Sequence, residues 1–192
     1  QCLIRPGVDQ ASKQTDRDDW TVAGVGRPGA HVVSQVGGQA AYGGTPSDAS
    51  IRAAIATLEA RGLSVVFYPF VMMDVPPGNA LPDPRNPAGF QPPYPWRGRV
   101  TCHPAPDVAG SPDGTGAAAS QIAAFFGTAS AAHFTVVGEV VSYAGPDEWS
   151  YRRMVLHNAA LCKAAGGVDA FIIGSEFVGL TPPRWKRRLA WG

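Results

Sequence analysis

The sequence has few charges, few cysteines and no long apolar runs. Only 16% of its 192 residues are charged, and 16 basic against 15 acidic side chains leave a net charge of +1. This balance gives no electrostatic grip on nucleic acid or on an anionic membrane, so neither is expected as a partner. Because no run of eighteen apolar residues occurs, we expect no membrane insertion, and no signal peptide is visible.

Metal and cofactor motifs are also missing. The three cysteines, Cys2, Cys102 and Cys162, are odd in number and far apart. No CxxC pair and no Cys/His pair at metal spacing occurs, so we expect neither a disulfide framework nor a metal site. The sequence has no dinucleotide fingerprint and no phosphate loop, and no cofactor is predicted. We expect free thiols, at least one of them buried in a helix.

Glycine and proline, by contrast, are abundant. The 23 glycines and 18 prolines stand beside an apolar share of 45%, which predicts a folded core with unusually long connections. Prolines crowd residues 72–112, where we expect no regular element and a functional loop or a partner surface. Its aromatic residues Phe90, Tyr94 and Trp96, close to two arginines, suit stacking on a sugar ring or packing back on the domain.

The pattern of apolar residues predicts alternating helices and buried strands. Two helix–strand units recur, and strands that are apolar on both sides are typical of a parallel sheet covered by helices. The predicted class is therefore α/β. The helices are expected over residues 47–61, 116–126 and 148–165, and the strands over 63–71, 133–143 (broken at Gly138) and 168–174.

Glu176 is the most informative residue for chemistry. It follows the apolar run 168–174 directly, with the small residue Ser175 before it. A carboxylate at the carboxyl end of a parallel barrel strand lies at the mouth of the barrel, where such enzymes act. Burial among aromatic side chains would favour its protonated form, which suits a general acid toward a glycosidic oxygen. The alternative is an edge carboxylate that caps the following segment.

Three more residues are candidates, each with a second interpretation. Asp74 holds the equivalent place after the run 63–71, either as a sugar contact or as the Asp that begins a turn before two prolines. Tyr68 lies within that run and faces either the core or the barrel mouth. Glu139 is either a second carboxylate or, as we prefer, part of the solvent face of a half-buried strand.

Several stretches of the chain resemble one known family. That family is the TIM-barrel-like domain of the gene transfer agent host-specificity proteins, which are large baseplate or tail-tip components of phage-like particles. The likeness runs over nearly the whole chain, from about residue 2 to residue 181. The stretches that carry it are residues 41–49, 67–74, 94–99, 148–153 and 166–176.

The resemblance implies part of a (β/α)₈ barrel, with parallel strands inside and helices outside. It implies an incomplete TIM-barrel-like domain over residues 1–181, with its long loop at 72–112, and an unmatched basic tail over residues 182–192. The family is similar in turn to retaining glycoside hydrolases, in which a Glu after strand four is the acid/base, and Glu176 is the matching position. Those enzymes commonly carry Asn or Thr where this chain has Ser175. Their nucleophile comes from strand seven, which is expected beyond this chain.

The resemblance therefore implies a tail-tip or baseplate component, assembled in the cytoplasm into a phage-like particle, that engages cell-surface polysaccharide and contacts other tail proteins. In the enzyme hypothesis Glu176 is the general acid/base, and Asp74, Tyr68, Trp96 and Ser175 contact the sugar. In the alternative, the barrel is a non-catalytic structural or carbohydrate-binding module. The chain alone is expected to be inactive in both cases, and its abrupt tail is what a truncated or frame-shifted fragment would have.

Overall fold

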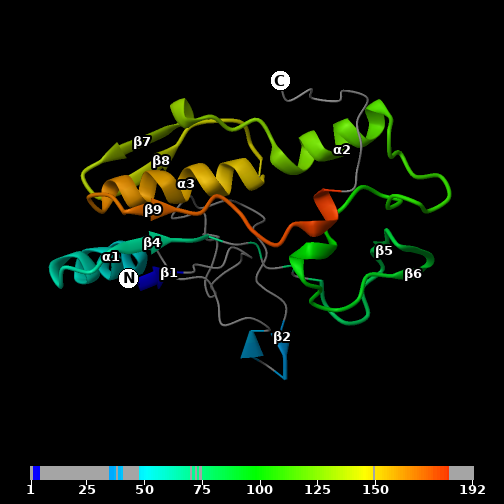
Figure 1. Cartoon of the computed structure of the whole chain (residues 1–192), viewed down its shortest axis with the longest axis horizontal. Helices are drawn as coiled ribbons and strands as arrows, with labels where there is room; N and C mark the ends of the chain where they lie inside the picture. Colours follow the sequence, from blue (N-terminus) through cyan, green and yellow to red (C-terminus); the bar gives the residue numbers. More distant parts are fainter. Residues whose placement is uncertain are drawn as a thin grey trace. The chain divides into compact units, whose positions relative to one another are not determined.

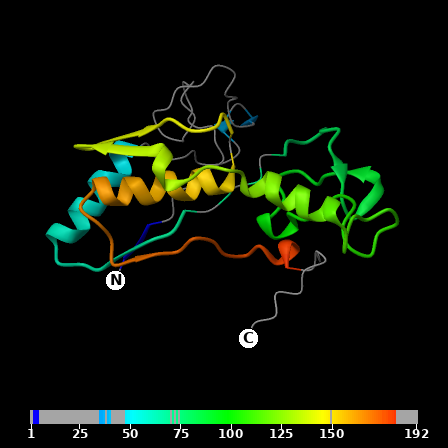
Figure 2. The ribbon, with the colours of Figure 1, turned by 90° about the horizontal axis from the view of Figure 1, so that it is seen from above.

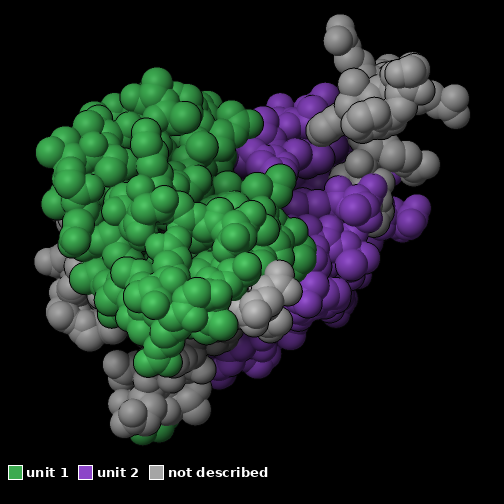
Figure 3. Space-filling view, turned by 60° about the vertical axis from the view of Figure 1, so that its left-hand side comes forward, with its two compact units in different colours: residues 1–72, 127–175 green, residues 73–126, 176–192 purple. Residues whose placement is uncertain are grey.

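The computed structural model describes most of the chain from residue 48 onward, and short pieces before it. These residues fall into two compact units (Figure 3). Unit 1 combines Gln1–Met72 with Gly127–Ser175, and unit 2 combines Met73–Phe126 with Glu176–Gly192. The described residues are 2–4, 35–37, 39–40, 48–69, 71, 73, 75–148 and 150–181.

Unit 1 contains a three-stranded parallel sheet (Figure 1). Its strands, in order across the sheet, are β1 (Cys2–Ile4), β4 (Val65–Phe67) and β9 (Ala170–Phe171). The predicted parallel pairing is confirmed, with Val66 opposite Ala170 and Phe67 opposite Phe171. Strands β4 and β9 are shorter than the apolar runs that predicted them, and the predicted burial of the second run is wrong, because Ala170 is exposed and Ile173 is 69% exposed. Within the described residues the sheet does not close into a barrel.

Two of the predicted helices belong to unit 1. They are α1 (Asp48–Ala60) and α3 (Tyr151–Ala164). Helix α1 ends as its sequence predicts, because Gly62 has a φ of +70° and its N–H donates to the carbonyl of Glu59 at 2.8 Å. Helix α3 begins at Ser150, whose side chain accepts a hydrogen bond from the N–H of Arg153 at 3.2 Å.

The core of unit 1 lies between these helices and β4. Phe67 is fully buried and stacks on Phe171, with 5.6 Å between ring centroids. Apolar residues three and four apart on α1 face the same side, as an amphipathic helix requires. The buried residues of this core are Ile51, Ile55, Val65, Phe67, Val141, Leu161 and Cys162.

The segment 133–143 is a hairpin, which corrects the prediction of one broken strand. Strands β7 (Phe134–Val137) and β8 (Val140–Tyr143) pair antiparallel and both contact α3 (Figure 2). Gly138, with a φ of +57°, supplies the left-handed conformation that a two-residue hairpin turn needs. The chain therefore reverses direction at the position where the sequence indicated only an interruption.

The Glu148 carboxylate links residues 128–129 to the start of α3. It accepts the backbone N–H groups of Thr128 and Ala129, each at 2.8 Å, and the hydroxyl of Ser150 at 2.7 Å. Desolvation raises the pKa of Glu148, but these hydrogen bonds outweigh it and hold the pKa at about 2. The tie is therefore an ionised one at neutral pH.

Unit 2 contains the Pro-rich segment, which is more regular than predicted. The expectation that 72–112 holds no regular element is wrong, because β5 (Pro82–Asp83) pairs antiparallel with β6 (Asn86–Phe90), and η2 (Arg97–Arg99) is a short 3₁₀ turn. Side-chain amides support this hairpin: Asn79 Nδ2 donates to the carbonyls of Pro76 and Gln91 at 3.0 and 2.9 Å. The rest of unit 2 includes the predicted helix α2 (Gly116–Phe126) and the 3₁₀ turn η4 (Val178–Leu180).

The cysteine prediction is confirmed where the structure describes the side chains. Cys102 and Cys162 are free and buried, and Cys162 lies on α3. Burial raises the pKa of Cys162 to about 12, so this thiol is unreactive at neutral pH. None of the described helices is both long and apolar enough to cross a membrane.

Candidate functional site

Glu176 lies just after β9, at the point where the chain enters unit 2. Its φ is +59°, a left-handed conformation that costs a residue with a Cβ about 1 kcal/mol. Its side chain is 53% exposed, so the expected burial among aromatic residues is wrong. A strained backbone that holds a half-exposed carboxylate is common at functional sites.

Trp96 and Arg97 both bind the Glu176 carboxylate. The indole Nε1–H of Trp96 donates to Oε2 at 2.9 Å, and Nη2 of Arg97 lies 2.7 Å from the same oxygen. One carboxylate oxygen of a half-exposed side chain is thus fixed by two donors.

Two glycines allow this arrangement to form. A Cβ on Gly98 would overlap the ring of Trp96, so only glycine lets the indole lie against this turn. A Cβ on Gly179 would lie 2.6 Å from the carbonyl oxygen of Gly98. Turns η2 and η4 therefore approach each other backbone to backbone, which brings Glu176 to residues that precede it by eighty positions.

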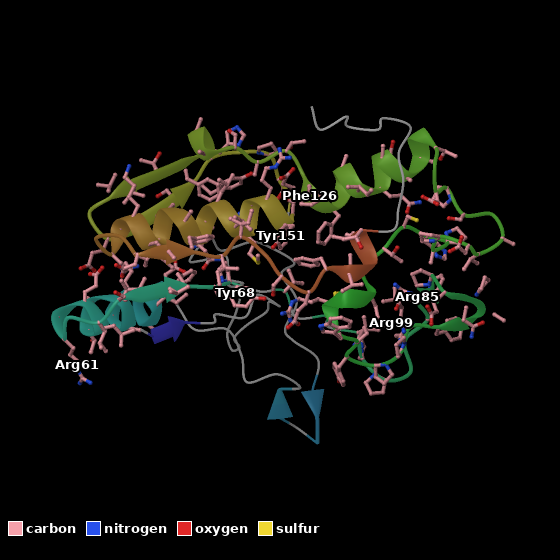
Figure 4. All side chains as sticks on the ribbon, in the orientation of Figure 1. Arg61, Tyr68, Arg85, Arg99, Phe126 and Tyr151 are labelled. Carbon is pink, nitrogen blue, oxygen red and sulfur yellow. The ribbon has the colours of Figure 1, made fainter. Side chains whose placement is uncertain are left out.

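A second ion pair supports η2 from the other side. Asp83 is 8% exposed, and its carboxylate binds Nη2 of Arg99 at 3.1 Å. The same carboxylate accepts the backbone N–H of Arg85 at 2.9 Å, and Nη1 of Arg85 donates to the carbonyl of Arg99 at 2.9 Å. Figure 4 places Arg85 and Arg99 close together on unit 2. The turn that carries Trp96 and Arg97 is thereby held by a nearly buried charge pair.

Aromatic packing fixes the segment after Glu176. The ring of Phe177 meets the edge of Phe125 on α2, with 6.0 Å between centroids, and Phe125 meets Phe126 in the same way at 5.4 Å. Of the aromatic residues in the Pro-rich segment, Phe90 is 65% and Trp96 51% exposed, while Tyr94 is half-buried. Half of the indole surface is therefore free to meet a ligand.

The structure brings together only two of the predicted site residues, Glu176 and Trp96. Tyr68 directly follows β4 in unit 1 and is 8% exposed, and Ser175 is half-buried at the end of the same unit. Asp74 and the basic tail 182–192 lie outside the described residues.

Glu139 is not on a strand face. It lies in the hairpin turn, 79% exposed, with its carboxylate 3.4 Å from Nη2 of Arg52. The preferred solvent-facing position is therefore confirmed, but on a turn rather than a strand. A pair this exposed contributes little to stability.

Arg97 is the site residue that sequence reasoning missed. Its side chain is only 11% exposed, so the charge that binds Glu176 is largely withdrawn from water. The available signal was its place beside Trp96 in a stretch that carries the family resemblance. Among the described residues no cluster of His, Cys, Asp or Glu is arranged to hold a metal ion.

Residues 149–188 match the family model of the GTA TIM-barrel-like domain. This part of the chain, which contains α3, β9, Glu176 and η4, is similar to a TIM-barrel-like domain of gene transfer agents. No curated protein and no solved structure matches the chain.

Proposed function

We propose that the chain is part of a glycoside-hydrolase-like barrel in a tail-tip or baseplate protein of a gene transfer agent, where it engages cell-surface polysaccharide. The family match supports the gene transfer agent context, and it includes Glu176. The protein is assembled in the cytoplasm into a phage-like particle, and its other partners are tail and baseplate proteins.

The parallel sheet of unit 1 supports the barrel. Strands β1, β4 and β9 lie side by side in this order in the sheet, and α1 precedes β4 as α3 precedes β9 along the chain. Strands that follow one another around the sheet with helices in between are the pattern of a (β/α)₈ barrel. In such a barrel Glu176, after β9, belongs to the face that carries the active site.

The observation that carries the proposal is the hydrogen bond from Trp96 Nε1 to Glu176 Oε2 at 2.9 Å. It fixes the side chain of Trp96, a residue 51% exposed, beside a carboxylate whose side chain is 53% exposed. A sugar ring can pack its C–H face on the indole and donate a hydroxyl to Oε1, which is how aromatic and carboxylate side chains together bind carbohydrate.

Binding without hydrolysis is the version that the site favours. Retaining hydrolysis needs a second carboxylate about 5–5.5 Å from the acid/base, and the hydrolase relatives take it from their seventh strand. The Arg97 ion pair also engages Oε2 as a carboxylate, so proton donation from that oxygen would require the pair to open. Hydrolysis with Glu176 as acid/base remains the second candidate because the residue matches the acid/base position of those enzymes.

The test measures binding and cleavage of envelope polysaccharide from the encoding bacterium by the full chain. Trp96→Ala and Glu176→Gln are compared with Phe90→Ala and Glu139→Gln, which remove a more exposed ring and a more exposed charge elsewhere. We expect the first two to weaken binding about tenfold, as losing one aromatic or charge-assisted contact does, and the controls to leave it unchanged.

Two readouts separate the outcomes. New reducing ends made by the wild type but not by Glu176→Gln would establish the hydrolase. Binding without new reducing ends would establish a polysaccharide-binding site, and it would leave a hydrolase in the whole protein open because this chain alone is expected to be inactive. If the wild type binds no polysaccharide, or if all four variants bind equally well with unchanged circular dichroism spectra, the proposal fails.

A further inference from the structure

We propose that the bound polysaccharide is acidic and that Arg85 binds its anionic group, a sugar carboxylate or phosphate. This inference rests on the proposed function and names its substrate class. Three features of unit 2 support it: the pairing of its charges, the hydrogen bonds that hold Arg85, and the position of Arg85 relative to Trp96.

Around turn η2, three described guanidinium groups (Arg85, Arg97 and Arg99) lie close to two described carboxylates (Asp83 and Glu176). Arg97 pairs with Glu176 at 2.7 Å, and Arg99 pairs with Asp83 at 3.1 Å. No described carboxylate pairs with the guanidinium of Arg85, which is exposed. The cluster around Trp96 therefore carries one positive charge that the described protein does not neutralise, although the chain as a whole is almost neutral.

Arg85 is fixed in place, unlike most exposed arginines. Its Nη1–H donates to the carbonyl of Arg99 at 2.9 Å, and its backbone N–H donates to Oδ1 of Asp83 at 2.9 Å. Asp83 is nearly buried, so the base of the side chain is anchored as well as its end. A guanidinium already held in one orientation loses less entropy when it binds an anion, and its planar fork matches carboxylate and phosphate oxygens.

The same short segment of chain contacts both Trp96 and Arg85. Glu176 accepts the indole N–H at the start of this segment, and at its end a Cβ on Gly179 would lie 3.1 Å from Nη2 of Arg85. One turn of chain thus separates the carboxylate that binds the indole from the guanidinium of Arg85. A charged sugar unit or its neighbour can therefore reach Arg85 while a ring lies on Trp96.

The pairing of Glu176 with Arg97 is what makes an anion acceptable here. An unpaired carboxylate beside the indole would repel an acidic sugar, but Arg97 neutralises it. With both carboxylates of the cluster paired, the unpaired charge is the cation of Arg85. A neutral glycan would leave that cation without a partner, so the site discriminates in favour of acidic chains.

The experiment titrates the full chain with three forms of one envelope polysaccharide from the encoding bacterium: untreated, carboxyl-reduced and dephosphorylated. The variants are Arg85→Gln, Arg85→Lys, Trp96→Ala and the matched control Arg61→Gln, which removes an equally exposed charge at the end of α1. We expect Arg85→Gln to lower the affinity for untreated polysaccharide about tenfold, as loss of a charge-assisted contact does. Arg85→Lys retains part of the affinity, and Arg61→Gln retains all of it.

Chemical removal of the anion should reproduce the mutation. Carboxyl reduction or dephosphorylation, whichever removes the recognised group, lowers wild-type affinity to the same extent and has no further effect on Arg85→Gln. If Arg85→Gln weakens binding but neither treatment does, Arg85 is only a support for η2 and the inference is wrong. If Trp96→Ala alone weakens binding, the proposed function stands and the acidic ligand is wrong. If no form binds to any variant, both proposals fail.

Discussion

Unit 1 and unit 2 are ordered by different interactions. The core of unit 1 is made of large apolar side chains from α1, β4, β8 and α3, among them Phe67, Ile55 and Leu161, all fully buried. Among the described residues of unit 2 the buried hydrophobic side chains are smaller, and they include Val75, Cys102, Ala105 and Ala118. Unit 2 is held instead by charge pairs, by amide-to-carbonyl hydrogen bonds and by two glycines at a close approach.

This contrast teaches where a functional site can form. Large apolar side chains pack into a core, and the helices and strands that they stabilise present few reactive polar groups. Turns held by polar side chains place those same polar groups at the surface, where they meet a ligand. The site at Glu176 belongs to the second kind, since polar side chains of Asp83 and Arg85 bind the backbone beside and within the turn η2, which follows Trp96 and contains Arg97.

The largest expected effect is a loss of stability in unit 1. Phe67→Ala removes a fully buried ring and its stacking on Phe171, and we expect it to lower the free energy of unfolding by about 4 kcal/mol. Urea unfolding followed by far-ultraviolet circular dichroism measures this. Val137→Ala, at a site 71% exposed, is the control and should change the free energy by less than about 0.5 kcal/mol. Equal effects of the two variants would mean that unit 1 lacks the core described.

The second effect breaks unit 2 without touching the core of unit 1. Gly179→Ala places a methyl group against the carbonyls of Gly98 and Val100, and we expect it to separate η2 from η4 at a cost of about 2 kcal/mol. Hydrogen exchange of peptides from residues 82–100 should then accelerate, while peptides from α1 and α3 keep their protection.

The matched control for that substitution is Gly116→Ala. Nothing lies within 4 Å of a Cβ at Gly116, and alanine suits the first residue of α2 better than glycine. Its exchange should be unchanged or slower. Faster exchange throughout the chain in Gly179→Ala would show that the two units do not respond separately.

The smallest expected effect is a pH-dependent change in the stability of unit 1. The pKa of Glu148 is about 2 in the folded chain, below its ordinary value of 4.5, so its contribution is complete above pH 4.5 and is lost as pH falls toward 2. Because the group is partly exposed, we expect Glu148→Gln to cost only about 1 kcal/mol at neutral pH. The difference from wild type should disappear near pH 2 in urea unfolding measured between pH 6 and 2.

Glu139→Gln gives the comparison for that measurement. Its carboxylate is 79% exposed and has one long contact, so its substitution should change stability little at any pH. If the difference in unfolding free energy between Glu148→Gln and wild type is unchanged at pH 2, the shape of the Glu148 side chain and not its charge stabilises the contact with Thr128 and Ala129.

Helices were predictable because their signals are local. Spacings of three and four apolar residues, a capping residue and a final glycine gave α1, α2 and α3 within a few residues. The apolar run that became β7 and β8 was harder, because both a broken strand and a hairpin satisfy alternating valines around a glycine. Both strands also pack on α3, a contact that the pattern of this stretch does not encode.

Only part of the site was predictable, because only some of its signals are local. Glu176 stood out because a carboxylate after a buried run is unusual, and Trp96 because it is an aromatic residue in a Pro-rich loop. Nothing local joins them, and nothing local assigns Arg97 to one carboxylate and Arg99 to another. Those pairs depend on the approach of η2 to η4, which Gly98 and Gly179 allow.

Patterns within single stretches of chain therefore account for the helices, for the parallel strands β4 and β9 and for the residue types available for chemistry. Only the tertiary structure decided which oxygen of Glu176 is occupied, that its side chain is half-exposed, and that Arg85 lacks a carboxylate partner among the described residues. The physical reason is that charge pairing and burial depend on residues distant in sequence. Their meeting is set by backbone packing, which no local pattern encodes.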